Sequence, residues 1–73
     1  ETGETFSAAR RIAGIYARMA PEDAARIIGT METGQIVRLL KLMRPEDASD
    51  VFARLPLAKA REVTERMLER PAL

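Results

Sequence analysis

The sequence predicts an all-α fold of five short helices, and two observations lead to this prediction. The segment Met19-Ala-Pro-Glu-Asp-Ala24 returns 24 residues later as Met43-Arg-Pro-Glu-Asp-Ala48. Around these copies, apolar residues recur every 12 residues and fall at positions i, i+3, i+4 and i+7 of each block, which is one face of an α-helix. Such self-similarity is typical of stacked helical repeats. We therefore expect a 24-residue helix-turn-helix repeat.

Four columns of apolar residues run through the blocks and form the expected core. The first column holds Ile12, Ala24, Ile36, Ala48 and Ala60, and the second holds Ile15, Ile27, Leu39, Val51 and Val63. The third column holds Tyr16, Ile28, Leu40, Phe52 and Thr64, and the fourth holds Met19, Met31, Met43, Leu55 and Met67. Because only 4% of the residues are aromatic, aliphatic side chains and methionine must form most of this core.

The first helix is expected to start near Thr5, which can cap its N-terminus, and to end at Met19. Its apolar face is extended by Phe6, Ala9 and Ala13. Gly14 lies inside this helix at a cost of about 1 kcal/mol relative to alanine. That cost has two interpretations, a close contact with another helix or an ordinary surface glycine.

Proline marks the starts of the second and fourth helices. Pro21 and Pro45 suit the first helical position, where a backbone N–H would have no partner. Two carboxylates follow each proline, and acidic side chains in a first turn interact favourably with the positive end of the helix dipole. The second helix is expected over about residues 21–31 and the fourth over about residues 45–55.

The third helix, expected over about residues 33–43, is the most apolar because Val37 and Leu42 join its column positions. It should therefore lie centrally and be buried on more than one side. The fifth helix is expected from about residue 57 to residue 69. Ala60 and Thr64 replace larger residues on its inner face, so it is expected to cap the array with a more polar outer face.

The length of 73 residues allows one small domain, which we expect over residues 5–70. Residues 1–4 are expected to be a disordered linker or a remnant of cloning, and residues 71–73 a tail. No apolar run approaches the roughly 20 residues that span a bilayer, and no signal peptide is evident. Attachment to a membrane is therefore expected only through segments outside this sequence.

The composition argues against an enzyme. There is no cysteine and no histidine, so the chain lacks thiolate ligands, the usual general base and the commonest metal ligand. Ser7 and Ser49 have no histidine to activate them. Twelve basic and eleven acidic residues give a net charge of +1, which predicts no strong attraction to nucleic acid. We expect no catalytic residues and no required cofactor.

Two sets of charged residues are candidates for binding. Stacked short helices bind protein partners through their exposed surfaces, and the basic residues expected to contact a protein are Arg26, Arg38 and Lys41. Carboxylates are the hard oxygen ligands that Mg²⁺ or Ca²⁺ prefers, and those near the helix starts are Glu22, Asp23, Glu46, Asp47 and Asp50. Parallel stacking of the two helices would bring these carboxylates together. Helix capping explains them without a metal, so both interpretations stay open.

The pattern Ile15-Tyr-Ala-Arg-Met19-x-Pro-Glu-Asp-Ala-Ala-x-Ile27, followed by a second Met-x-Pro-Glu-Asp-Ala copy, resembles the MgtE intracellular N-terminal domain superfamily. The resemblance covers about residues 12–67. It implies a right-handed superhelix of short helices, related in shape to the middle region of the flagellar switch protein FliG. It also implies a non-enzymatic role.

Two functional contexts within this superfamily fit the pattern. The Ile-Tyr-x-x-Met-x-Pro block and the Lys59-Ala60 pair resemble the C-terminal domain of MotE-type flagellar motor proteins. This favoured interpretation implies a periplasmic scaffold or chaperone-like domain that binds a flagellar motor component, in a membrane-anchored protein dimerised by an upstream coiled coil. The alternative is the Mg²⁺-sensing regulatory N-domain of an MgtE-type magnesium transporter, at the cytoplasmic face of the inner membrane. There the acidic helix starts would sense Mg²⁺.

Overall fold

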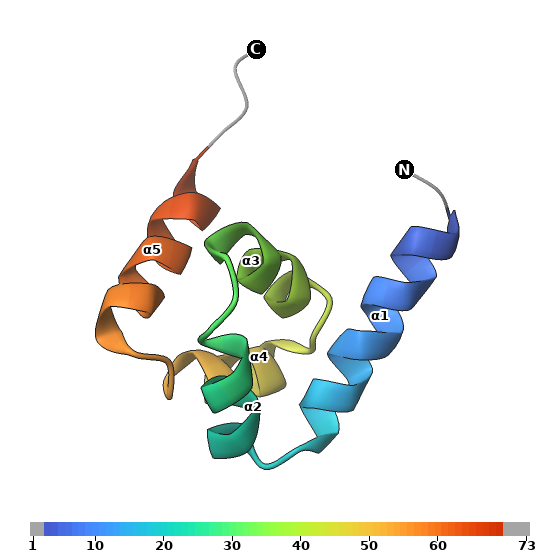
Figure 1. The fold of residues 1–73 in the computed structure, drawn as a ribbon, viewed down its shortest axis with the longest axis horizontal. Helices are drawn as coiled ribbons and strands as arrows, with labels where there is room; N and C mark the ends of the chain where they lie inside the picture. The colour runs from blue at the N-terminus through green and yellow to red at the C-terminus, as the bar shows by residue number, and fades with distance from the viewer. Residues whose placement is uncertain (1–2, 70–73) are drawn as a thin grey trace.

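The computed structural model describes residues 3–69, with side chains described from Ser7 onward. This part of the chain folds into five α-helices and contains no strand. The helices, shown in Figure 1, are α1 (Gly3–Arg18), α2 (Pro21–Ile28), α3 (Thr33–Lys41), α4 (Pro45–Phe52) and α5 (Leu57–Leu68). The predicted all-α fold of five helices is therefore confirmed.

Helices that are two apart in the sequence pack against each other. α1 packs on α3, α2 on α4 and α3 on α5, and α1 also contacts α2. Figure 1 shows α3 in the middle, with α1 and α5 on opposite sides of it. The two copies of the Met-x-Pro-Glu-Asp-Ala motif, 24 residues apart, accordingly begin α2 and α4, two helices that pack together. The central, buried position predicted for α3 is confirmed, since it buries Ile36, Val37, Leu39 and Leu40.

The proline starts of α2 and α4 are confirmed, but these helices and α3 end earlier than expected. After Ile28 the backbone tightens, and the N–H groups of Thr30 and Met31 bond to carbonyls three residues back, at 3.1 and 3.0 Å. The same tightening follows α3 and α4, where Met43 and Leu55 bond in this way at 3.2 and 3.1 Å. The fourth-column residues therefore lie in the turns that follow α2, α3 and α4.

The first helix starts two residues before the expected start near Thr5. α1 begins at Gly3, so Thr5 lies inside its first turn rather than at its N-cap, and residues 3 and 4 are helical rather than part of a linker. The remaining residues of the expected linker, 1 and 2, lie outside the described residues, as do residues 70–73 with the expected tail. The expected inward position of Phe6 falls outside the described side chains.

The apolar columns predict the core well in the inner helices. Column residues that are buried include Ala24, Ile28, Ile36, Leu39, Leu40, Met43, Val51, Leu55 and Val63. Ala13, Ala25 and Val37 complete the buried core. Among the described residues, no polar or charged residue is buried. The core is therefore formed almost entirely by aliphatic groups, as the composition predicts.

Five column residues are exposed instead, which corrects the expected core at its margins. These are Ile12, Ile15, Ile27, Thr64 and Met67. α1 turns its small residues inward, with Ala13 buried and Ala17 packed on the core, so it can lie close to its neighbours while its isoleucines stay outside. In α2, Ala25 takes the inner position expected for Ile27.

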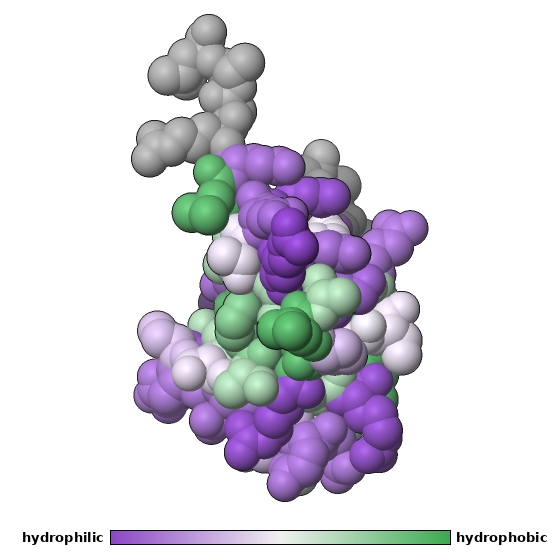
Figure 2. All heavy atoms as spheres, turned by 90° about the vertical axis from the view of Figure 1, so that its left-hand side faces the viewer, coloured by the Kyte–Doolittle hydropathy of each residue, from purple (hydrophilic) through white to green (hydrophobic). Residues whose placement is uncertain are grey.

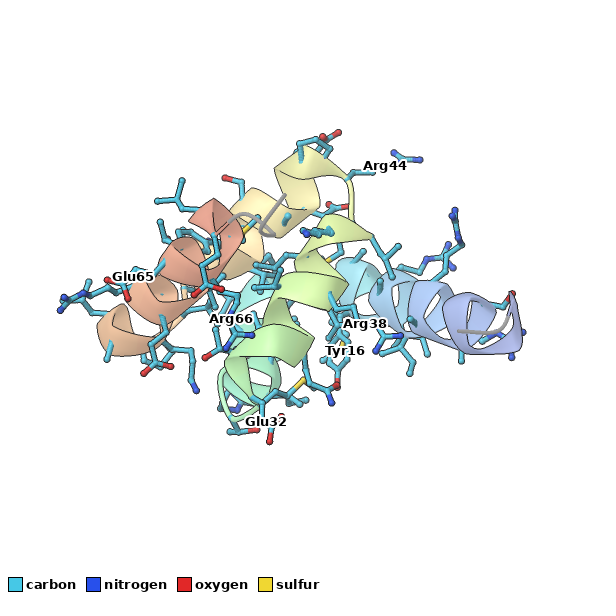
Figure 3. All side chains as sticks on the ribbon, turned by 90° about the horizontal axis from the view of Figure 1, so that it is seen from above. Tyr16, Glu32, Arg38, Arg44, Glu65 and Arg66 are labelled. Carbon is cyan, nitrogen blue, oxygen red and sulfur yellow. The ribbon has the colours of Figure 1, made fainter. Side chains whose placement is uncertain are left out.

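Polar contacts fasten α5 to the start of α3. The hydroxyl of Thr33 donates a hydrogen bond to the Glu62 carboxylate at 2.9 Å. Arg66 packs over Gly34, where a Cβ atom would lie 3.0 Å from one guanidinium nitrogen. Figure 3 shows Arg66 reaching from α5 to α3. These contacts hold α5 in register on the central helix.

Candidate interaction surfaces

The predicted cation ligands lie at equivalent positions on two helices that pack against each other. The first turns of α2 and α4 carry Glu22, Asp23, Glu46 and Asp47. Asp50 lies one turn further along α4 and is exposed. Within residues 3–69, no three acidic side chains come close enough together to hold a metal ion. The described residues therefore hold no cluster of three acidic ligands, and contact of these carboxylates with Mg²⁺ stays a prediction.

The local surroundings of these carboxylates match their role as helix starts. Pro21 and Pro45 occupy the first positions of their helices, and no side chain caps either helix. Asp23 pairs with Arg26 at 3.1 Å, one turn further along α2. Each carboxylate can therefore stabilise its helix by about 0.3 to 1 kcal/mol, through its interaction with the positive end of the helix dipole. This interaction with the helix dipole explains the position of the carboxylates without a bound metal ion.

The three basic residues predicted to contact a partner lie on two helices. Arg26 is in the last turn of α2, where its side chain is held by Asp23. Arg38 lines a hollow between α1 and α3, beside the exposed Ile12, and Figure 3 shows it on the α1 side of α3. Lys41 is the last residue of α3 and is exposed. Arg38 and Lys41 are therefore near each other on α3, whereas Arg26 belongs to a different helix.

The two ends of the helix array carry exposed apolar side chains. On α1, the exposed fraction of Ile15 is 55%, and on α5 it is 86% for Leu57 and 74% for Leu68. Terminal helices of a repeat array usually present a polar outer face to water. Most other exposed residues of α5 are polar, among them Arg61, Glu62 and Glu65, so Leu57 and Leu68 are apolar exceptions on the helix predicted to be a polar cap.

An apolar groove with a volume of about 390 Å³ runs between α4 and α5. Residues that line it include Leu40, Pro45, Ala48, Phe52, Thr64 and Met67. Figure 2 shows the α5 side of the molecule, where apolar residues gather across the middle between polar areas above and below. The sequence pattern places most of these residues on the inner face, so it did not predict a groove that is open to solvent.

A second hollow, of about 600 Å³, lies between α1 and the start of α4. Three arginines, Arg11, Arg18 and Arg44, line it together with Ile15 and Asp47. Arg11 and Arg18 share one face of α1, because residues seven apart are two helical turns apart. That spacing was a usable signal in the sequence. The approach of Arg44 depends on the tertiary fold and could not be read from the sequence.

The comparisons with known proteins identify one family. The family model for the MgtE intracellular N domain matches residues 6–72, a range that includes all of α2 to α5 and most of α1. Searches of curated proteins and of solved structures found no significant match. No helix within the described part of the chain is long and apolar enough to cross a membrane.

Proposed function

The chain belongs to the MgtE intracellular N domain family, and from this premise we propose that it is the regulatory domain of an MgtE-type magnesium transporter. The family match over residues 6–72 supports the transporter interpretation better than the MotE-type one that the sequence pattern favoured. In this proposal the domain lies at the cytoplasmic face of the membrane. It acts by binding to other parts of the transporter and carries out no reaction.

The chemistry of the chain supports a role in binding. With no histidine and no cysteine, it lacks the groups that most often act as general bases or thiolate nucleophiles. No polar or charged residue is buried among those described, so the described residues lack the buried ionisable groups that are typical of active sites. Regulation by docking needs neither a catalytic side chain nor a buried ionisable group.

The exposed apolar residues at both ends of the array are the observation that carries this proposal. Ile15 lies on α1, Leu57 and Leu68 lie on α5, and more than half of each side chain is exposed. Covering such side chains contributes about 25 cal/mol per Å² of buried apolar surface. Two apolar ends suit a domain whose terminal helices pack against neighbouring parts of a larger protein.

The MotE-type interpretation rested partly on the Lys59-Ala60 pair, which packing explains. The Lys59 ammonium donates a hydrogen bond to the Met31 backbone carbonyl at 3.2 Å, and Ala60 packs against the core. Both residues are therefore accounted for by the attachment of α5 to the rest of this domain. No feature of the described surface favours a flagellar partner over a transporter.

A response to Mg²⁺ is a separate part of the proposal. Glu22 and Glu46 are exposed and make no ion pair or hydrogen bond within the described residues. Mg²⁺ is usually held by one or two protein carboxylates together with water. We infer that any site using these residues is completed by ligands outside this chain, so the isolated domain would bind the ion only weakly.

The reading frame on both sides of this chain tests the proposed function. Membrane-spanning segments and CBS-like sequence downstream are expected. In the parent protein, deletion of residues 3–69 should preserve Mg²⁺ transport. The deletion should also prevent the transporter from closing when the internal Mg²⁺ concentration is high. An upstream membrane anchor with heptad repeats, followed by a stop codon soon after Leu73, would instead support the MotE-type interpretation.

A further inference from the structure

The hollow between α1 and the start of α4 carries a concentration of positive charge that the fold itself does not use. Within the described residues, Arg11, Arg18 and Arg44 make no ion pair and no side-chain hydrogen bond. Two other exposed arginines, by contrast, are held by neighbours on their own helices, Arg26 by Asp23 and Arg61 by Glu65. These three guanidinium groups are therefore available to a ligand.

The charge in this hollow is not balanced locally. Asp47 is the acidic residue among those that line it, so three positive charges face one negative charge. Figure 3 shows Arg44 leaving the turn before α4 and extending over the side of the molecule where α1 lies. Two of the arginines thus come from one face of α1, and the third approaches from the neighbouring turn.

Gly14 and Ile15 form the part of the hollow between the arginines. A Cβ atom built on Gly14 would meet nothing within 4 Å, so packing inside the domain does not require this glycine. A glycine in the middle of a helix lowers helix stability. At Gly14, no close packing contact within the described residues offsets this cost. Beside it, Ile15 is more than half exposed. Because Gly14 has no side chain, another helix could approach the backbone of α1 closely at this point and contact the exposed Ile15.

We propose that this hollow binds an acidic helix of a protein partner, which lies along α1. Two carboxylates on the partner, two turns apart, would face Arg11 and Arg18, and a further carboxylate would face Arg44. An aliphatic side chain between them would rest on Ile15 over the bare backbone of Gly14. This inference rests on the proposed docking function and names the surface and the chemistry of the partner.

The spacing of the arginines favours a helix over a small anion. Arg11 and Arg18 are about 10 Å apart along the axis of α1, at 1.5 Å per residue, which is also the spacing of two residues that lie two turns apart on a partner helix. The lining of the hollow contains no aromatic residue on which a nucleic-acid base could stack. An acidic helix repeats its charges at the same spacing as α1 and supplies the apolar contact as well.

Binding of a designed peptide to the isolated domain tests this proposal. The labelled helical peptide carries two glutamates seven positions apart, the spacing of Arg11 and Arg18, with a leucine between them and a third glutamate on the side that would face Arg44. A matched peptide has glutamine in place of all three glutamates. We expect the glutamate peptide to bind, to weaken as salt is raised, and to bind at least about tenfold more tightly than the glutamine peptide.

Three variants locate the binding surface. The triple variant R11Q/R18Q/R44Q should weaken peptide binding by at least about tenfold, because each removed charge contributes modestly and the three act together. The matched triple variant R54Q/R61Q/R66Q changes the net charge equally and should stay within about twofold of the unchanged domain. Gly14→Leu should weaken binding by about tenfold while the melting temperature does not fall, since leucine is a better helix former than glycine.

Several results would overturn the proposal. They are equal effects of the two triple variants, equal binding of the two peptides, and unchanged binding by Gly14→Leu. Competition by millimolar inorganic phosphate, or tighter binding to phosphatidylglycerol vesicles than to the peptide, would assign the hollow to a phosphate group or a membrane surface instead. All of these measurements use the isolated domain. A failure here is therefore distinct from a reading frame that contains no transporter, which would overturn the proposed function alone.

Discussion

Gly29, which follows α2, lies against the ring of Pro56 in the turn before α5. A Cβ atom built on Gly29 would lie 3.2 Å from Cδ of Pro56 and 2.9 Å from the backbone oxygen of Ala25. The φ angle of Gly29 is −63°, an ordinary value for any residue. The glycine is therefore explained by the close approach of the Ala25 oxygen and of Pro56 rather than by backbone freedom.

Gly29→Ala should lower the free energy of unfolding, because the added methyl group must displace the Pro56 turn or the end of α2. Overpacking of this kind costs about 1 to 3 kcal/mol. Urea denaturation followed by far-ultraviolet circular dichroism measures the change. Gly14→Ala is the matched control, and it should raise the free energy of unfolding by about 1 kcal/mol, because its Cβ would enter open space. Changes of the same sign in both variants would contradict this account of the two glycines.

Lys59→Met should also destabilise the domain, although more weakly. The substitution keeps most of the apolar stem and removes the ammonium group that bonds to the Met31 carbonyl at 3.2 Å. We expect a loss of about 1 kcal/mol, the usual contribution of a hydrogen bond, measured as a lower melting temperature. The control is Arg61→Met, whose side chain is 79% exposed, and which should change stability by less than about 0.5 kcal/mol. If the two variants have the same melting temperature, the Lys59 contact does not stabilise the fold.

The repeat in the sequence predicted the inner part of the fold and failed at its ends. Pro21 and Pro45 located two helix starts because proline has few favourable places in a helix. The period also located most of the buried residues of α2 to α4, which have neighbours on several sides, although it placed Ile27 of α2 inside and the structure buries Ala25 instead. In α1 the same period predicted that Ile12 and Ile15 are buried, but a terminal helix has fewer neighbours, and its small residues allow the closest packing.

The candidate surfaces were less predictable, because they depend on which turns come together. Arg44 follows Arg18 by 26 residues, and it lines the same hollow only because the fold brings the start of α4 to the same side of the molecule as the end of α1. Conversely, the paired carboxylates of α2 and α4 suggested a shared cation site. These helices do pack together, yet no three acidic side chains gather within the described residues. Charge pattern alone does not determine how helix starts align.

The buried and exposed isoleucines predict a strong contrast between two identical substitutions. Ile36 on α3 is fully buried, with 0% of its surface exposed, whereas 55% of Ile15 is exposed. Ile36→Ala should cost about 2 to 5 kcal/mol through lost burial and the cavity that remains, which is a large part of the stability of a small domain. Ile15→Ala should change the free energy of unfolding by about 0.5 kcal/mol or less. Chemical denaturation of both variants measures the difference, and a similar loss in each would mean that Ile15 belongs to the core.

Mg²⁺ should raise the melting temperature of the domain only if the acidic helix starts bind it. Glu46 and Asp47 occupy one first turn, and an ion held between like charges relieves their mutual repulsion. If the dissociation constant is near 1 mM, Mg²⁺ at ten times that concentration would stabilise the domain by about 1.4 kcal/mol. This free energy corresponds to a rise of several degrees in the melting temperature of a domain of this size.

The double variant E46Q/D47N should remove most of this rise in melting temperature, and E62Q/E65Q on α5 should keep it. Thermal melts at constant ionic strength separate ion binding from charge screening. Should the unchanged domain melt at the same temperature with and without Mg²⁺, these carboxylates serve the helix dipole alone, and Mg²⁺ sensing by the parent protein requires ligands from elsewhere.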